Sequence, residues 1–186
     1  MGLFNRKSKK SADVAAPAAS APATTPATRT AVSEPAVPNA ELTGTWTLDP
    51  SHTTLGFSAR HAMVTTVRGQ FGEFEGTGVV DAANPSASSA KVVIKAASID
   101  TGVADRNGHL RSGDFLDTET FPDLTFVSSD VQLVDGSTFR VTGELTIKDA
   151  TRPLTIDLEH TGIARDPFGN LRAGFEGETT INRKDW

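Results

Sequence analysis

The sequence predicts an all-β fold, an antiparallel sheet that forms a sandwich or a closed barrel, and three observations carry this prediction. Apolar and polar residues alternate along residues 139–147 and 154–159, as they do in strands that bury one face and expose the other. Turn sequences separate the alternating runs, with Asp-Pro at 49–50, Asn-Pro at 84–85 and Asp-Gly at 135–136. The runs recur roughly every ten residues, which is typical of a meander.

The alternation places strands at residues 44–49, 53–59, 71–81, 90–99, 122–134, 138–147, 153–163 and 171–181. Two segments interrupt it. Residues 60–69 are predicted to form a short helical turn that ends at Gly69, and residues 104–117 a second helix with Asp105 as its N-cap. Gly143 and Gly177 fall on the apolar face of their strands, where they either bend the strand or leave room in the interior, and we favour bending.

The chain divides into a tail over residues 1–42 and a folded domain over residues 43–186. Residues 11–40 hold eleven Ala, five Pro and seven Ser or Thr, too little apolar surface to offset the ordering entropy, so we predict a disordered tail. Basic residues open the tail, but no long apolar run follows them, which argues against a cleaved secretory signal. We therefore expect a cytoplasmic protein with no stable membrane insertion.

Composition excludes several classes of function. The 186-residue chain contains no Cys, which excludes disulfides, thiol catalysis and Cys-ligated metals. Its net charge is −5 at pH 7 and the folded part has no basic stripe, which argues against nucleic-acid binding. The chain also lacks the glycine-rich loops that bind mononucleotides or dinucleotides, so we expect no cofactor.

The segment DRNGHLRSGDF, from Asp105 to Phe115, is the densest in side chains that can do chemistry. Asp105 and His109 share one helical face, but a zinc site needs a further ligand from elsewhere, so we expect no metal. Ser112 and Asp114 lie beside His109, although catalytic triads are assembled in space rather than in a short run. The carboxylates of Asp114 and Asp117, with Glu119, could also serve in acid–base catalysis, but charges in a solvated loop are the commoner case.

Two arginines in this segment have two possible roles. Arg106 and Arg111 either bind a phosphate as forked donors or pair with nearby carboxylates and fasten the loop, and composition alone favours the structural role.

Histidines elsewhere are expected to be structural. His160 lies on the apolar face of its strand and is expected to be a hydrogen-bonded core residue, while His52 is expected to close the turn after Asp49.

Long segments of the folded part resemble the YceI family and occur in the family's order. They are WTLDPSHTTLGFSARHAMVTTVRGQFGEFEG, ASIDTG, RNGHLRSGDFLDTETFPDLTF, VTGELTIKDATRPLTI, DPFGN and RAGFEGETTINRKDW. The segment around His109 matches the family's RxxHLRSxDF-like signature. The resemblance runs from about residue 44 to residue 186, and several long matches in order make it specific.

The resemblance implies a lipocalin-like antiparallel β-barrel with one or two short helices and a binding function without catalysis. Family members resemble carriers that hold a polyisoprenoid, so we expect an isoprenoid-type lipid partner, either a prenyl quinone or a prenyl pyrophosphate, for transport, storage or sequestration. A barrel of about eight strands can enclose one small ligand. The residues expected to line the interior or its mouth are Phe57, Phe74, Phe115, Phe121, Phe126, Phe139, Val141, Leu145, Ile156, Leu158 and Phe175. The residues expected to meet the ligand headgroup, from a helical cap beside the mouth, are Arg106, His109, Arg111 and Asp114.

Two features depart from the family pattern. Many members carry a secretory signal where this chain has a polar Ala-Pro tail, which again favours the cytoplasm. The pattern usually continues beyond the NRKD at 182–185 with an aromatic residue, a glycine and at least one further strand. We therefore expect an open seam with unpaired backbone groups. Three interpretations stay open: a truncated product, pairing with a second copy as a homodimer, or weakened ligand binding.

Two other functions stay open beside the lipid carrier. One is an enzyme of unknown reaction centred on His109 and Asp114. The other is a protein-interaction module, in which side chains fill the barrel and the tail or the open edge recruits a partner. A fully packed interior with no cavity would favour the interaction module, and loss of turnover in His109→Ala with unchanged ligand retention would favour the enzyme.

Overall fold

The computed structural model describes residues 40–61 and 64–186. The elements in chain order are η1 (Ala40–Leu42), β1 (Gly44–Thr47), β2 (Leu55–His61), β3 (Thr65–Phe71), β4 (Phe74–Val80), η2 (Pro85–Ala87), β5 (Ser89–Lys95), η3 (Ala96–Ser98), β6 (Ile99–Asp100), α1 (Ala104–Arg111), β7 (Asp123–Leu133), β8 (Thr138–Ile147), β9 (Ala150–Arg165) and β10 (Leu171–Glu178). The η elements are single 3₁₀ turns. Strands dominate these residues, and the predicted all-β class is confirmed.

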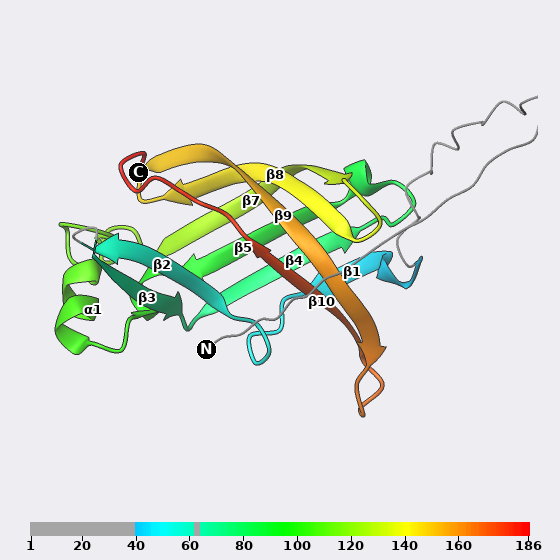
Figure 1. Cartoon of the computed structure of the whole chain (residues 1–186), viewed down its shortest axis with the longest axis horizontal. Helices are drawn as coiled ribbons and strands as arrows, with labels where there is room; N and C mark the ends of the chain where they lie inside the picture. The colour runs from blue at the N-terminus through cyan, green and yellow to red at the C-terminus, as the bar shows by residue number, and fades with distance from the viewer. Residues whose placement is uncertain (1–39, 62–63) are drawn as a thin grey trace, which may run out of the picture. The chain divides into compact units, whose positions relative to one another are not determined.

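Most strands belong to one antiparallel sheet in the order β1-β4-β5-β7-β8-β9-β10. This sheet curls into a half-barrel, as Figure 1 shows, and among the described residues β1 and β10 are its edges. A second antiparallel sheet contains β2, β3 and β6, and α1 lies beside it at one end of the curled sheet (Figure 1). The fold is thus the expected lipocalin-like type, with the described residues forming a half-barrel.

The two faces of the curled sheet follow directly from the alternation in the sequence. In β8 the side chains of Phe139, Val141 and Leu145 are buried, whereas the intervening Arg140 and Glu144 are exposed. Because β8 pairs along its whole length with β7 on one side and β9 on the other, its backbone groups are satisfied within the sheet. The apolar side chains can therefore be buried without leaving polar backbone unpaired.

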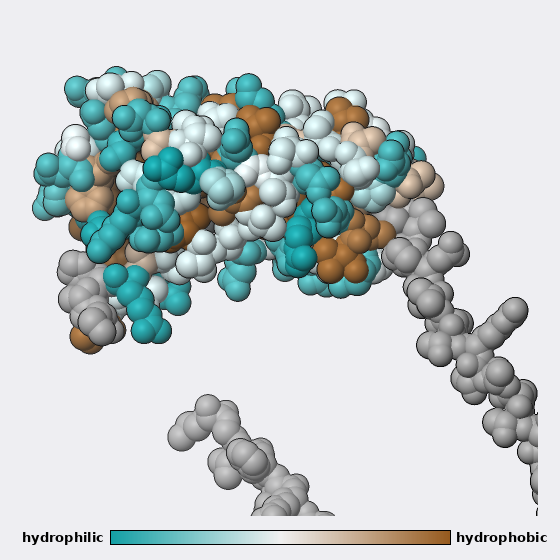
Figure 2. Space-filling view, turned by 90° about the horizontal axis from the view of Figure 1, so that it is seen from above, coloured by the Kyte–Doolittle hydropathy of each residue, from teal (hydrophilic) through white to brown (hydrophobic). Residues whose placement is uncertain are grey.

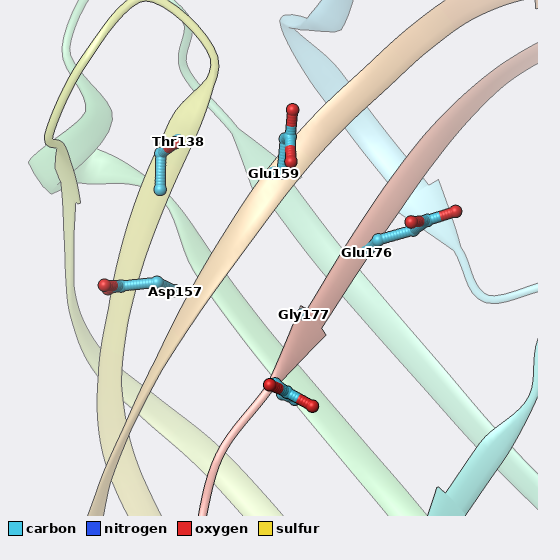
Figure 3. A pocket seen from close by; sticks show the side chains of 6 residues that line it. Thr138, Asp157, Glu159, Glu176 and Gly177 are labelled. Carbon is cyan, nitrogen blue, oxygen red and sulfur yellow. The ribbon is translucent and has the colours of Figure 1, made fainter. Parts of the chain in front are cut away.

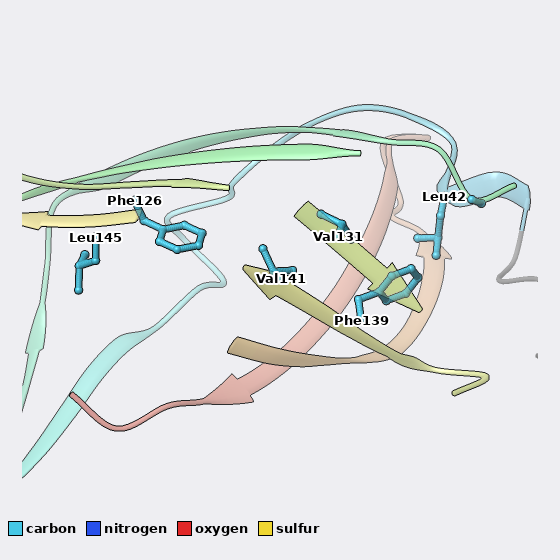
Figure 4. Close-up of a cluster of buried hydrophobic side chains, with 7 residues drawn as sticks. Leu42, Phe126, Val131, Phe139, Val141 and Leu145 are labelled. Carbon is cyan, nitrogen blue, oxygen red and sulfur yellow. The ribbon is translucent and has the colours of Figure 1, made fainter. Parts of the chain in front are cut away.

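The core lies inside the curl, where Figure 4 shows side chains from several strands converging. Its buried members are Leu42, Ala82, Phe126, Val131, Phe139, Val141 and Leu145. Leu42 belongs to η1 and is fully buried, and its carbonyl accepts a 2.7 Å hydrogen bond from the indole Nε1 of Trp46. The ordered part thus includes residues just ahead of position 43. Residues 1–39 of the predicted tail lie outside the described residues.

One helical prediction is wrong. Residues 65–71 form β3, which pairs with β2 from Leu55↔Phe71 to His61↔Thr65, instead of continuing a helical turn to Gly69. The sequence TTVRGQF is rich in β-branched residues, which favour strands. Gly69 is needed for a close approach and not as a helix end, because a Cβ there would lie 2.5 Å from the ring of Phe57.

The second helical segment is confirmed as α1, but its N-cap is different. The capping position is Val103, which has extended backbone and makes no side-chain capping bond, and Asp105 lies within the first turn. A carboxylate in that turn still interacts favourably with the helix dipole.

Gly143 allows close packing between strands. A Cβ at this position would meet the carbonyl oxygen of Val127, the ring of Phe126 at 2.7 Å and the Cα of Ser128 at 2.8 Å. A register shift in β7 lies next to this contact, between Ser128 and Asp130. Glycine is required here because the neighbouring strand and an aromatic ring occupy the space of a side chain.

Candidate functional site

The inner face of the curled sheet consists of the side chains of β4, β5 and β7 to β10 that point into the curl. It is almost wholly apolar, but its burial is uneven. The inner residues of β7 and β8 are mostly buried, while those of β9 and β10 stay half-buried or exposed. Phe175 of β10 is 40% exposed, because β10 pairs only with β9 among the described strands. Apolar surface is therefore accessible along one side of the curl.

Most of the residues predicted to line the interior lie on this face. They are Phe74, Phe126, Phe139, Val141, Leu145, Ile156, Leu158 and Phe175. The four on β7 and β8 are buried in the core cluster, and Leu158 packs against it. Phe175 completes an aromatic contact across the sheet, with its ring centroid 6.1 Å from that of Phe139.

Three predicted lining residues lie elsewhere. Phe57 belongs to β2 of the small sheet. Phe115 follows α1, where it makes an edge contact of 4.8 Å with the ring of His109 and lies 5.8 Å from the guanidinium of Arg183. Phe121 is half-buried in the same loop. These two form part of the cap around α1 and are not members of the core cluster.

The two arginines of this cap hold the backbone before the helix. Arg106 donates from Nε to the hydroxyl of Thr101 at 2.8 Å and from Nη2 to its carbonyl at 2.9 Å. Arg111 donates from Nη2 to the carbonyl of Ile99 at 3.0 Å. These guanidinium groups fix α1 against β6, so the arginines fasten the segment as expected, but through carbonyl and hydroxyl groups and not through the carboxylates that were predicted.

An asparagine that the sequence analysis did not single out completes this attachment. The side-chain oxygen of Asn107 accepts bonds from the backbone N–H and the hydroxyl of Thr101, at 2.9 and 2.7 Å. Its Nδ2 donates to Asp100 at 2.7 Å. The backbone N–H of Gly102 and then this amide lower the pKa of Asp100. The density of polar groups in this segment is therefore largely explained by the attachment of a short helix.

The remaining polar pair of the cap is exposed. Nε2 of His109 lies 3.5 Å from a carboxylate oxygen of Asp114, and their side chains are 61% and 81% exposed. Water screens an exposed pair such as His109 and Asp114 strongly, so the attraction between the two side chains is weak.

Among residues 40–61 and 64–186, no group of three or more His, Asp or Glu side chains is arranged to hold a metal ion.

Ion pairs join the β9–β10 hairpin to the segment after β1. Arg172 contacts Asp49 and donates to Asp166 at 3.0 Å, although Asp49 lies 123 residues away in the sequence. The pKa of Asp49 is lowered to about 2, first by its 2.8 Å hydrogen bond with His52 and then by the N–H of Ser51. His52 thus closes the turn after β1, as expected.

Asp166 has a similarly acidic carboxyl group within the hairpin turn. Its pKa is lowered to about 2, chiefly by the side-chain amide of Asn170, which donates a 3.0 Å bond, while Arg172 adds a further donor. The hairpin and the β1 edge are thereby held together by charged hydrogen bonds where no strand pairing joins them.

A hollow of about 510 Å³ lies on the outer face of β8 to β10 and is unlike the inner face. Figure 3 shows its lining side chains, which are Thr138, Asp157, Glu159, Glu176 and Glu178 together with Gly177. Carboxylates dominate it, and Asp157 already accepts hydrogen bonds from Nε and Nη2 of Arg140 at 2.7 and 2.8 Å. Figure 2 shows the molecule from above, where hydrophilic residues and brown hydrophobic patches lie side by side on the surface. An acidic, open hollow is unsuited to an apolar chain.

His160 is a polar residue on the inner face. It lies on β9 in register with Phe175, and the ring centroids are 5.2 Å apart. Its Nε2 atom is buried from solvent and has no hydrogen-bond partner among the described residues. The expectation of a hydrogen-bonded core histidine is thus wrong for this ring nitrogen. Its inward position could be predicted from the alternation, but its missing partner could not.

Comparison with known proteins identifies the family. The sequence model of the YceI-like domain matches residues 46–186. The chain belongs to the YceI family. It is 41% identical over 135 residues to a UPF0312 protein of Pseudomonas aeruginosa strain LESB58, covering 73% of this chain and 70% of that one. It is 40% identical over 135 residues to Protein YceI of Escherichia coli O157:H7, with the same coverage.

Solved structures agree with this assignment. The YceI protein of Campylobacter jejuni superposes with a TM-score of 0.60 at 32% identity, over 75% of this chain and 82% of that one. BcnA of Burkholderia cenocepacia gives a TM-score of 0.63 at 28% identity, over 74% and 82% of the two chains. Separately, the helices in the described part of this YceI-family chain are all too short or too polar to cross a bilayer.

Proposed function

We propose that the inner face binds one elongated, isoprenoid-type lipid, and that the protein transports, stores or sequesters it. The observation that carries the proposal is the accessible apolar surface of β9 and β10 on a sheet that curls around it. Ile156 and Leu158 are half-buried and Phe175 is 40% exposed, although all three point into the curl. Contiguous apolar surface of this kind marks binding sites in soluble proteins.

The energetics of an isoprenoid suit such a surface. Each CH₂-sized unit removed from water contributes roughly 0.8 kcal/mol before the cost of ordering the chain. A long prenyl chain supplies many such units and few polar groups, so a largely apolar inner face can bind it. A prenyl quinone and a prenyl pyrophosphate share this apolar chain, and both are compatible with the half-buried side of the curl.

Catalysis has weaker support than binding. The alternative enzyme would use His109 and Asp114, but this pair is exposed and lies on the cap of α1, away from the core cluster. Catalytic acids and bases are commonly found in clefts where burial and neighbours tune their pKa values. A packed interaction module is also less well supported, because the inner residues of β9 and β10 are incompletely covered.

The test compares the same new charge on the two faces of β9. Leu158→Asp puts a carboxylate on the inner face, while Thr155→Asp puts one on the outer face of the same strand. Binding of geranylgeraniol to the full chain is measured by displacement of the dye N-phenyl-1-naphthylamine. An unpaired charge in an apolar site costs several kcal/mol, so we expect binding to fall at least tenfold in Leu158→Asp and to change little in Thr155→Asp.

A second inner variant separates loss of binding from loss of folding. Leu158→Trp adds no charge but fills space beside β10, and should also weaken binding. Thermal melts by circular dichroism establish that each variant is folded. Equal binding by the wild type, Leu158→Asp and Leu158→Trp would refute an inner-face site.

A further inference from the structure

The unsatisfied nitrogen of His160 indicates where the polar end of a ligand is bound. Nε2 is buried and has no hydrogen-bond partner among the described residues, and the ring packs against that of Phe175 with the centroids 5.2 Å apart. Buried polar atoms in proteins nearly always have a hydrogen-bond partner, and an exception calls for an explanation such as a bound group. The inner face presents this single unsatisfied nitrogen amid apolar side chains.

The position of His160 along the sheet defines an end of the curl. Its backbone N–H donates to the carbonyl of Ser137 at 2.8 Å, in the turn between β7 and β8. The loop after α1 leads to the opposite end of β7, which begins at Asp123. His160 therefore lies beside the β7–β8 turn, away from the α1 cap in which the headgroup contacts were predicted. Figure 1 shows α1 at the opposite end of the curled sheet from this turn.

The charges around this position select the chemistry of the polar group. Glu159, which precedes His160 on β9, and Asp157 point to the outer face, and Glu176 of β10 lies in register with Glu159 (Figure 3). Of the nearby cations, Arg140 is paired with Asp157, and Arg165 further along β9 lies 4.0 Å from Glu41. A pyrophosphate would therefore find carboxylates, and cations that already contact carboxylates, among these neighbours. One imidazole nitrogen instead matches one neutral oxygen.

We propose that Nε2 of His160 hydrogen-bonds to a neutral oxygen, a hydroxyl or a carbonyl, at the polar end of the bound lipid. The apolar chain then runs along the inner face towards the α1 end. This inference rests on the proposed lipid-binding function and adds the head chemistry, the residue that reads it and the orientation of the ligand. It selects a prenyl alcohol or quinone over a prenyl pyrophosphate.

The test uses four probes with matched C20 chains on the full-length protein. They are geranylgeraniol for the hydroxyl, menaquinone-4 for the carbonyl, geranylgeranyl diphosphate for the anion, and the hydrocarbon phytane as a chain without a head. Displacement of N-phenyl-1-naphthylamine gives the affinities. We expect the alcohol or the quinone to bind about five- to tenfold more tightly than phytane, as one hydrogen bond allows, and the diphosphate to bind more weakly than either. Tighter binding of geranylgeraniol would indicate a hydroxyl oxygen as the partner of Nε2, and tighter binding of menaquinone-4 a carbonyl oxygen.

Three variants assign the preference to one atom. His160→Leu should remove the advantage of the neutral head over phytane, measured as the ratio of the two affinities in the same variant. His160→Gln, which keeps a donor, should retain part of that advantage. Thr155→Leu, an equally apolar change on the outer face of the same strand, should retain all of it. Thermal melts check that the variants are folded.

The outcomes separate this inference from the function on which it rests. An undiminished preference in His160→Leu, or tightest binding by the diphosphate, would overturn the role of His160 while the site for the chain stands. Failure of all four probes, phytane included, to bind the wild type would overturn the lipid site itself.

Discussion

The close packing around Gly143 predicts that one methyl group has opposite effects at two glycines. In Gly143→Ala the new Cβ would collide with the carbonyl oxygen of Val127 and approach the Cα of Ser128 at 2.8 Å. Both are backbone atoms and cannot move aside as a side chain does. Overpacking costs about 1–3 kcal/mol, and we expect the upper end of that range here. For a chain of this size 3 kcal/mol corresponds to a melting temperature lower by about 6–12 °C.

Gly108→Ala is the matched control. Gly108 lies inside α1, and a Cβ there would meet nothing within 4 Å. Because alanine favours a helix over glycine by about 1 kcal/mol, we expect the melting temperature to rise by about 2–4 °C. Thermal unfolding followed by circular dichroism measures both. A shift of 2 °C corresponds to no more than about 1 kcal/mol in a chain of this size. A Gly143→Ala melting temperature within 2 °C of the wild type would therefore refute the packing argument.

Three further predictions concern the polar contacts. The pKa of about 2 for both Asp49 and Asp166 is below the unfolded value of about 3.9, so their stabilisation is present above that value and is lost as pH falls from about 5 to 2. The double variant Asp49→Asn, Asp166→Asn should lose less stability over this range, and melts at pH 5 and 2.5 check it; equal acid sensitivity would contradict it. Asn107→Ala should speed amide exchange in α1 but leave that of β7 and β8 unchanged, since its bonds hold only the helix to β6. The Lys95–Asp123 pair is 51% and 37% exposed, so a double-mutant cycle should give less than about 1 kcal/mol, and a larger coupling would show that this pair is better shielded than its exposure implies.

Strand positions could be predicted from the sequence because each inner residue carries a local, period-two signal. Residues 138–147 are predicted and observed as the same strand, β8. β3 was missed because Gly69 resembles a helix end, and only the ring of Phe57 across the hairpin explains why glycine is needed there. The local sequence pattern therefore fails to predict the role of a residue when that role depends on a side chain of another strand.

The candidate site was predictable in part for the same reason. The alternation identifies which side chains of β7 to β10 point inward, while their contact with a ligand stays a prediction. It does not show how far each is covered, which depends on the edge position of β10. Nor does it show that Arg172 contacts Asp49 across the open side, or that Nε2 of His160 has no partner. Both depend on which distant segments the curl brings together.

Organic extraction and mass spectrometry of the natively purified full chain test the central claim most directly. The wild type and Leu158→Asp are expressed and purified identically without detergent, and lipid is quantified per mole of folded protein. An inner-face lipid site predicts a near-stoichiometric isoprenoid lipid in the wild type and a strong loss of it in Leu158→Asp. A folded, monodisperse wild type whose extract contains no more isoprenoid lipid than that of the variant would contradict the claim.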